Sequence, residues 1–256
     1  MYGGIFDTHA HYDDAAFDYI RYATLSAMPE AGVSLILNCG SDEDSSAYAA
    51  ELAGAYPFVY SSAGVHPHEA ASAEPGYEER IASLLALPKT VAVGESGLDY
   101  HYAHSDRKTQ REVFGRLLAL AVSMDMPVVV HMRDSEDDIL AMLTEYRPRG
   151  VIHRFSGTPA MSHKLVDLGF YLGFGCAVTY DGSENELATL GTLPFERLLL
   201  ETDCPYLPPA WLRSELCRSD MIIFAAEAIA RIRPEYTPQQ IIDIGRDNGK
   251  RLFCIP

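Results

Sequence analysis

The sequence predicts a single (β/α)8 barrel of the TIM type. Eight apolar runs of strand-like composition alternate with segments of helical period, and 256 residues is the usual length for eight such units. No G-x-G-x-x-G motif follows the first run, which argues against the alternative, a doubly wound open sheet. No linker divides the sequence, so we expect one domain over residues 1–256.

The predicted strands have continuous apolar cores rather than alternating patterns. This is expected for parallel strands that helices cover on both faces. In chain order the strands are predicted over residues 3–11, 33–40, 58–68, 90–96, 127–133, 150–157, 169–175 and 197–203.

The intervening segments carry signals for helix starts and ends. Ser135 with Asp138 resembles a capping box, and Thr158 followed by Pro159 places proline at a first helical position. Glycines that fit helix ends leading into a strand are Gly32 and Gly169.

Composition limits the classes of function. The net charge of −16 argues against a wide basic surface for nucleic acid, but leaves room for a phosphate substrate in a small pocket where metal ions supply positive charge. No apolar run reaches the roughly 18 residues of a membrane helix, and no secretory signal is recognisable. The five scattered cysteines indicate reduced thiols. We therefore expect a cytoplasmic protein, by default a monomer.

Polar side chains gather where the predicted strands end. Eight of the nine histidines fall at these ends or in the loops that follow, and in a barrel the carboxyl ends of the strands carry the active site. The residues at strand ends are His9, His11, His66, His68, Glu95, Asp99, His131, Arg133, His153, Arg154, Ser156, Glu201 and Asp203.

Spacing and residue type suggest a metal site at this rim. Residues two apart in a strand face the same way, so His9 with His11, and Glu201 with Asp203, are expected to share a face. Imidazole and carboxylate together suit Zn²⁺ or Mn²⁺, with Mg²⁺ where oxygen ligands dominate. A lone strand-end histidine is usually structural, whereas the whole combination indicates metal binding.

The chain resembles the TatD family of metal-dependent hydrolases, within the amidohydrolase superfamily, over essentially its whole length. This resemblance implies a (β/α)8 barrel, a site for two divalent metal ions, and hydrolysis of phosphodiester bonds, usually described as DNase activity. The motifs that carry it are "FDTHAH" (6–11), "GVHPH" (64–68), "VGESGLDY" (93–100), Arg107 with Gln110, "PVVVHMRD" (127–134), "HRFSG" (153–157), "LLLETDCPYL" (198–207) and "NGKRLF" (248–253).

The resemblance also implies roles for particular residues. Asp203 would accept a proton from the attacking water besides binding metal, and His66 matches a further catalytic or substrate-contacting histidine. Asp7 and Glu201 are expected to orient imidazoles, or else only to form hydrogen bonds at strand ends. The implied ligands are His9 and His11 for one ion, Glu95 bridging both, His131 and His153 for the second, and Asp203.

Departures from the family pattern concern the substrate. Arg154 stands where many relatives have cysteine, and it either contacts phosphate, together with Arg133 and Ser156, or faces solvent. The segment 208–221 also departs from the family pattern. Its tryptophan, Trp211, either stacks on a base or packs over the barrel rim.

The expected function is hydrolysis of phosphodiester bonds in DNA by two-metal activation of water, with Zn²⁺, Mg²⁺ or Mn²⁺. The acidic chain favours short single strands or strand ends over long duplexes. An ester or amide hydrolase, for example a D-aminoacyl-tRNA deacylase, is the first alternative, and a non-catalytic metal-binding barrel is the second. Glu95 stands where lactonase-type relatives carry a bridging lysine, which argues against that branch.

Overall fold

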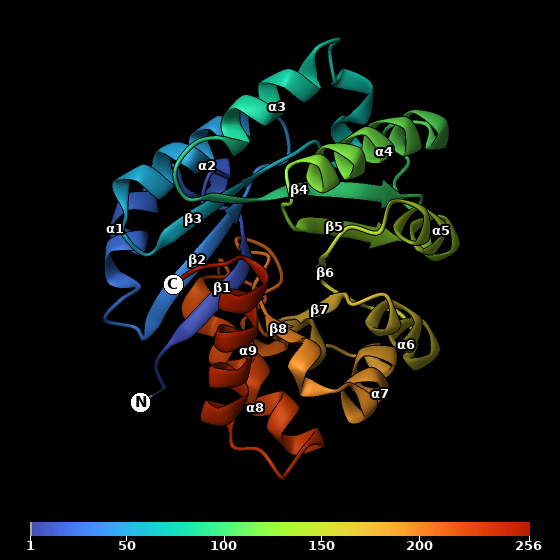
Figure 1. Cartoon of the computed structure of the whole chain (residues 1–256). Helices are drawn as coiled ribbons and strands as arrows, with labels where there is room; N and C mark the ends of the chain where they lie inside the picture. Colours follow the sequence, from blue (N-terminus) through green and yellow to red (C-terminus); the bar gives the residue numbers. More distant parts are fainter. Residues whose placement is uncertain (1) are drawn as a thin grey trace.

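The structure is a computed structural model that describes residues 2–256, in which eight parallel strands form one sheet in the order β1 to β8 (Figure 1). Each strand pairs with the next one along the chain. The strands are β1 (Ile5–Ala10), β2 (Val33–Cys39), β3 (Val59–Ala63), β4 (Thr90–Asp99), β5 (Val128–Arg133), β6 (Gly150–Ile152), β7 (Tyr171–Phe174) and β8 (Leu198–Leu200).

The sheet closes where the end of β1 meets the chain that leaves β8. The backbone N–H of Asp203 donates to the carbonyl oxygen of His9 at 2.9 Å, and the N–H of His11 donates to the carbonyl oxygen of Cys204 at 2.8 Å. Parallel pairing of Ala10 with Cys204 continues this contact. The predicted barrel is confirmed, and the alternative of an open sheet is wrong.

Helices surround the barrel, and Figure 1 shows α8 and α9 lying beside β1 and β8. The α-helices are α1 (Arg21–Ala27), α2 (Glu43–Ala55), α3 (Tyr77–Leu85), α4 (Arg107–Ser123), α5 (Glu136–Tyr146), α6 (Pro159–Asp167), α7 (Glu184–Thr192), α8 (Ile222–Ile232) and α9 (Pro238–Leu252). Short 3₁₀ helices are η1 (Ala15–Phe17), η2 (Pro67–Ser72), η3 (Cys176–Thr179), η4 (Phe195–Arg197), η5 (Ala210–Leu212) and η6 (Ser219–Met221).

The strands are buried on both faces, which explains their continuous apolar sequence. Every residue of β1, β7 and β8 is buried, and in β4 only Val91 is partly exposed. The helices therefore cover the outer face of the sheet, while the inner face packs on itself. All five cysteines are free. None of the helices formed by residues 2–256 is long and apolar enough to cross a membrane.

Three of the predicted helix boundaries are confirmed in detail. The hydroxyl of Thr158 accepts a hydrogen bond from the backbone N–H of Met161 at 3.3 Å, and Pro159 begins α6. Gly32 and Gly169 have φ values of +94° and +91°, the left-handed conformation that glycine adopts at low cost before the chain enters a strand.

The capping box expected at Ser135 is wrong. Ser135 does precede α5, but its hydroxyl donates to the carbonyl oxygen of Leu98 at 2.9 Å instead of capping the helix. The carboxylate of Asp138 accepts a hydrogen bond from the hydroxyl of Tyr100 at 2.5 Å. Both side chains therefore attach α5 to the end of β4, a tertiary role that local sequence does not reveal.

Several strands end earlier than predicted. β3 ends at Ala63, so His66 and His68 lie in the turn that begins η2 rather than in the strand. β8 ends at Leu200, and Asp203 has a left-handed φ of +64°. The alternation of a strand therefore does not reach Asp203, and the expectation that Glu201 and Asp203 share a strand face is wrong.

Candidate metal centre

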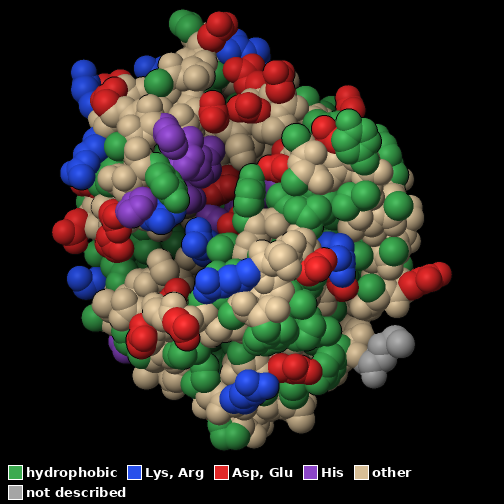
Figure 2. Space-filling view, turned by 180° about the vertical axis from the view of Figure 1, so that it is seen from behind, with side chains coloured by type: hydrophobic (Ala, Val, Ile, Leu, Met, Phe, Trp, Pro, Cys, Tyr) green, Lys and Arg blue, Asp and Glu red, His purple; other side chains and the backbone are tan. Residues whose placement is uncertain are grey.

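A cavity of about 660 Å³ opens at the carboxyl ends of the strands. Figure 2 shows it as a hollow in one face of the molecule, with histidines gathered at its side and acidic side chains inside. Five of the six residues expected to bind metal line it, and the sixth, His9, is completely buried behind them. The lining residues of this set are His11, Glu95, His131, His153 and Asp203.

A first group of ligand-type atoms comes from the closure of the barrel. The Nε2 atoms of His9 and His11 lie 3.0 Å apart, and Oε2 of Glu95 lies 3.2 Å from Nε2 of His9. Oδ1 of Asp203 lies 3.4 Å from Nε2 of His11. The meeting of β1 with the chain after β8 thus brings His9 and His11 together with Asp203, which lies more than 190 positions later in the sequence.

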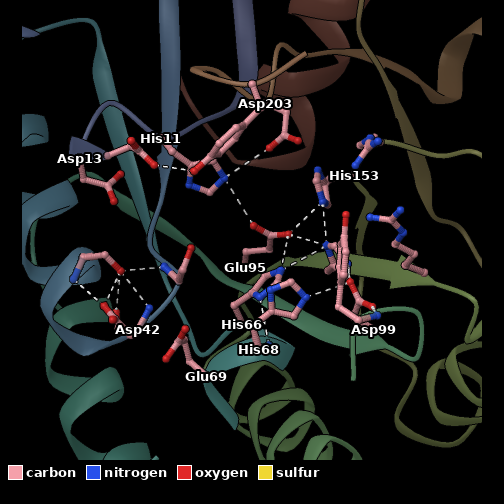
Figure 3. A pocket seen from close by; sticks show the side chains of 18 of the residues that line it. His11, Asp13, Asp42, His66, His68, Glu69, Glu95, Asp99, His153 and Asp203 are labelled. Atoms are coloured by element: carbon pink, nitrogen blue, oxygen red, sulfur yellow. Dashed lines mark hydrogen bonds and ion pairs between the residues drawn. The ribbon is translucent and has the colours of Figure 1, made fainter. Parts of the chain in front are cut away.

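A second group lies around the other oxygen of Glu95. Oε1 of Glu95 is 2.9 Å from Nδ1 of His131 and 2.9 Å from Nε2 of His153. Nε2 of His66 lies 3.5 Å from the same oxygen. In Figure 3, Glu95 stands between His11 and Asp203 on one side and His66 and His153 on the other. One carboxylate therefore faces both groups, with one oxygen toward each.

The chemistry of these donor sets fits divalent cations. The ligand-type atoms fall into three overlapping triads in which all atoms lie within 4.8 Å of one another. Nε2 of His9 and Nε2 of His11 face each other at 3.0 Å beside two carboxylates. Only one of these two nitrogens can donate a proton to the other, so the group has more acceptor atoms than donors. Divalent cations bound among these atoms would satisfy the nitrogens and oxygens together, and the mixture of ligands suits Zn²⁺, Mn²⁺ or Mg²⁺.

The electrostatics of the pocket also favour positive charge. Burial works against ionisation of Glu95, yet His153, His66 and His9 around it hold the pKa of this carboxyl well below its usual range. Burial likewise opposes charge on His11, but its hydrogen bond with Asp203 and the charge of Glu95 raise the pKa of His11 to about 9. The carboxylates thus remain ionised and attract protons or metal ions to the same positions.

Two imidazoles are oriented through their second nitrogen. Nδ1 of His11 lies 2.9 Å from the carbonyl oxygen of Cys39. Nε2 of His131 lies 3.0 Å from Oδ2 of Asp99, and the same oxygen lies 3.0 Å from Nε2 of His68. Such contacts select the tautomer of a metal-binding histidine. Sequence reasoning placed Asp99 and His68 at strand ends without a role, although the motifs "GLDY" and "GVHPH" contain them.

Asp7 forms hydrogen bonds with backbone groups on both sides of the barrel closure. Its carboxylate accepts hydrogen bonds from the N–H of His9 at 3.3 Å and the N–H of Thr202 at 3.0 Å. It also accepts from the hydroxyls of Thr202 and Ser219, at 2.6 and 2.7 Å. Burial raises the pKa of Asp7 to about 7, although these hydrogen bonds oppose the rise. Asp7 contacts no imidazole nitrogen within the described part of the chain, and instead joins β1 to the segment after β8.

Glu201 lies behind His153 in a space left by a glycine. Its Oε1 accepts a hydrogen bond from the backbone N–H of Arg154 at 2.5 Å and lies 3.6 Å from Nδ1 of His153. A Cβ atom on Gly173 would lie 2.1 Å from Oε2 of Glu201, so only glycine leaves room there for the carboxylate. Glu201 is therefore positioned to support the segment that carries His153.

The residues expected to contact substrate lie beside the second group. Arg133, Arg154 and Ser156 line a smaller cavity of about 140 Å³ together with His131 and His153. Both arginines also line the main cavity. Arg133 is the last residue of β5 and Arg154 lies in the loop after β6, so both side chains stand at the carboxyl ends of strands and reach the rim.

The opposite wall of the main cavity is acidic. Asp13, Asp42 and Glu69 line it, and Figure 3 shows them on the side of Glu95 away from His153. Asp13 also accepts a hydrogen bond from the side-chain amide of Asn38 at 2.6 Å. Sequence reasoning gave these acids no role, because each lies in a different loop and nothing in the local sequence brings them together.

Segment 208–221 lies apart from the lining of the main cavity. Trp211 is 60% exposed, and its ring packs edge-to-face on Phe224 of α8 with ring centroids 5.6 Å apart. Trp211 therefore packs on α8 outside the lining of the main cavity, and its proposed roles remain predictions. The residues after β8 that line the cavity are Asp203, Tyr206 and Leu207.

Comparison with known proteins places the chain in a family. A family model described as TatD related DNase matches residues 6–254. The metal-dependent hydrolase YabD of Bacillus subtilis, named as uncharacterized, is 34% identical over 98% of this chain and 99% of its own length. An enzyme of Klebsiella pneumoniae named 3'-5' ssDNA/RNA exonuclease TatD is 33% identical over 96% of this chain and 91% of its own length.

Solved structures agree with the fold. The crystal structure of YJJV, a TatD homologue from Escherichia coli K12, has a TM-score of 0.90 and 28% identity, and the alignment covers 98% of each chain. The TatD-family hydrolase of Entamoeba histolytica has a TM-score of 0.86 and 22% identity, over 99% of each chain, which supports the fold alone. The chain belongs to the TatD family of metal-dependent hydrolases.

Proposed function

We propose that this protein hydrolyses phosphodiester bonds at the ends of single-stranded nucleic acids, with two divalent metal ions as cofactors. The observation that carries this proposal is the position of Glu95, whose two oxygens face two separate groups of imidazole and carboxylate ligands. His9, His11 and Asp203 would hold one ion, His131 and His153 the second, and Glu95 both. The ions supply Lewis acidity, which lowers the pKa of water and offsets negative charge in the transition state.

Asp203 is the residue best placed to accept a proton from water. Its side chain is 14% exposed, whereas that of Glu95 is 4% exposed and faces ligand nitrogens on both sides. The histidines around it keep the pKa of Asp203 well below its usual range despite burial, so it is ionised and able to accept. His66 lies at the second group and lines the cavity, where it would contact substrate or complete the ligand set.

Arg133 and Arg154 would bind the phosphate oxygens of the substrate. Both line the cavity beside the second ligand group, and a guanidinium presents several donors to a phosphate. Ser156 lies with them around the smaller cavity and would add a hydroxyl donor. The backbone N–H of Arg154 donates a hydrogen bond to Glu201. This bond constrains the position of Arg154 relative to His153, the residue before it.

The charges that line the cavity favour the end of a nucleic-acid strand over its interior. Arginines line one side of the cavity and Asp13, Asp42 and Glu69 line the other, so a phosphate chain is attracted at one side and repelled at the other. A terminal nucleoside carries no further phosphate and fits the acidic side. The exonuclease name of the Klebsiella relative supports the same choice. The net charge of −16 adds repulsion of long polyanions, which salt screens.

Hydrolysis of an aminoacyl ester is the second candidate. The observation in its favour is the same acidic wall, because Asp42 and Glu69 would attract the ammonium group of an aminoacyl substrate. A non-catalytic metal-binding barrel is the third candidate, and the exposure of Asp203 to the cavity speaks against it.

One set of assays separates these candidates. The protein is supplied with Mg²⁺, Mn²⁺ or Zn²⁺ and given a 5′-labelled single-stranded DNA, the same strand as a circle, and a D-aminoacyl-tRNA. We expect a ladder of shortened products from the linear strand, little cleavage of the circle, and none after metal removal. Deacylation without DNA cleavage would replace the proposal with the ester hydrolase. Metal binding without any product would favour the non-catalytic barrel.

Some expectations from sequence remain predictions. They are a single functional domain over residues 1–256, a monomeric state, and a cytoplasmic location. Gel filtration with light scattering tests the monomer.

A further inference from the structure

Tyr102 is an exposed aromatic side chain at the edge of the cavity. It lies in the loop between β4 and α4, lines the cavity with Arg133, and is 53% exposed. A large exposed ring beside a phosphate-binding arginine is an unusual use of an aromatic residue, because tyrosines in folded proteins generally bury most of their ring.

The ring belongs to a built cluster rather than standing alone. The guanidinium carbon of Arg133 lies 4.5 Å from the centroid of the Tyr102 ring, a cation–π arrangement. The ring of His104 is nearly parallel to it, at 17° and 5.8 Å between centroids, so the two overlap only in part. His68 meets the Tyr102 ring edge-on at 5.6 Å. These contacts hold the ring, and the residue as a whole remains 53% exposed.

The loop is attached directly to the metal centre. Oδ1 of Asp99 accepts hydrogen bonds from the backbone N–H groups of His101 and Tyr102, at 3.0 and 2.9 Å. Oδ2 of the same carboxylate contacts Nε2 of His131 at 3.0 Å. One buried side chain therefore fixes the position of the Tyr102 backbone relative to the second ligand group. A group stacked on Tyr102 would be held in register with the reacting phosphate.

We propose that Tyr102 and His104 form a nucleobase subsite. The base of the nucleotide next to the scissile phosphate stacks on Tyr102, while Arg133, held against the ring, binds that nucleotide's phosphate. This inference rests on the proposed phosphodiesterase function and names the part of the substrate that it recognises. Stacking uses the flat face that every base has. The subsite therefore distinguishes a nucleotide that carries a base from an abasic one, but does not distinguish one base from another.

A second exposed tyrosine at the cavity is less suited to this role. The hydroxyl of Tyr206 donates to the carboxylate of Asp14 at 2.6 Å, which ties its ring to the acidic side of the cavity. A nucleotide stacked there would bring its phosphate near carboxylates, whereas at Tyr102 it meets Arg133. Charge therefore places the continuing strand at Tyr102 and the terminal nucleoside at the acidic side. The base on Tyr102 is that of the second nucleotide from the cleaved end.

The test compares two single-stranded DNAs that differ only at the second nucleotide from the cleaved end, which carries adenine or an abasic analogue. We expect the wild-type KM to be about tenfold lower for the strand with adenine, since stacking of one base is worth roughly that factor. Tyr102→Ala should bring this KM ratio close to one, and Tyr102→Phe should keep it. Tyr22→Ala is the matched control, because Tyr22 is 59% exposed on α1 and lies outside the cavity lining.

A binding measurement makes the result independent of catalysis. Fluorescence of 2-aminopurine at the same position should be quenched by the wild type and by Tyr22→Ala, and quenched much less by Tyr102→Ala. An unchanged KM ratio and unchanged quenching in Tyr102→Ala would overturn the subsite while leaving DNA hydrolysis in place. Absence of hydrolysis by the wild type, with quenching that depends on Tyr102, would keep the subsite and overturn the proposed reaction. Absence of both would overturn both.

Discussion

Gly173→Ala tests whether Glu201 must occupy its present position. The new Cβ would lie 2.1 Å from Oε2 and 2.7 Å from Cδ of Glu201. Unbonded atoms need roughly 3.5 Å, so the carboxylate must withdraw by about 1 Å. Glu201 is buried and its Oε1 is bonded to the N–H of Arg154, so it has no free volume to enter without giving up that hydrogen bond.

The expected cost follows from these contacts. Overpacking a tight site costs about 1–3 kcal/mol, and a buried N–H left without a partner costs about 1–3 kcal/mol more. We therefore expect the free energy of unfolding of the metal-free protein to fall by about 2–5 kcal/mol in urea titrations. Since Arg154 follows His153 directly, metal affinity measured by calorimetry should fall by about 10–100-fold, as when supports of a ligand are lost.

Two further variants isolate the cause. Gly191→Ala in α7 is the matched control, because its Cβ would have no atom within 4 Å, and alanine in a helix should raise the free energy of unfolding by about 0.5–1 kcal/mol. In a Glu201→Ala background the added methyl group has nothing to displace, so Gly173→Ala should cost less than about 0.5 kcal/mol. An equal cost of Gly173→Ala in both backgrounds would refute the reasoning, because contact with Glu201 would then not be its source.

Three other predictions concern the site itself. Glu95→Gln removes the negative charge that both ligand groups share. Calorimetry should therefore show weaker binding of both ions, and oligonucleotide hydrolysis should fall by more than about a hundredfold. Two tightly bound ions in this variant would contradict the proposal that Glu95 serves both ligand groups. Metal ions bind only the folded chain, so adding them at about 100 times Kd should raise the free energy of unfolding by about 2.7 kcal/mol, and an unchanged melting temperature would speak against a built site. Asp42→Asn combined with Glu69→Gln weakens repulsion at the acidic side, so strands with a terminal phosphate should be cleaved faster relative to strands with a terminal hydroxyl, most clearly at low salt. An unchanged ratio of the two cleavage rates would show that Asp42 and Glu69 do not select the ends of nucleic-acid strands.

The fold was predictable because its signals are local and repeated. Eight β-branched runs, each followed by a helical segment, give the strand count directly, and Gly32, Gly169 and Thr158 mark boundaries through their own backbone preferences. Strand ends were less predictable. His66 and Asp203 each lie three positions beyond the last strand residue, Ala63 and Leu200, and whether the ladder continues through such residues depends on the neighbouring strand.

The centre of the site was predictable for a similar reason, since the barrel converts strand ends into one rim. Its surroundings were not. The role of Asp7 depends on Thr202 and Ser219, which lie about two hundred positions away in the sequence. The opposition of Arg154 to Asp42 and Glu69 depends on which loops face each other across the rim. Contacts of this kind are set by tertiary packing and leave no periodic trace in the sequence.

The closure of the barrel has a consequence for when the protein becomes competent during its synthesis. His9 and His11 are among the first residues made, whereas Asp203, and the Thr202 that Asp7 binds, come more than 190 positions later. At about 5–20 residues per second, a growing chain spends many seconds with its first ligand group incomplete, because Asp203 is still missing. A prematurely terminated product lacking β8 would keep most of the strands, but its first ligand group would lack Asp203. A circular permutant opened between α7 and β8, in which linked termini join α9 to β1, would make Asp203 before His9 and His11 and place these three ligands within one short part of the chain.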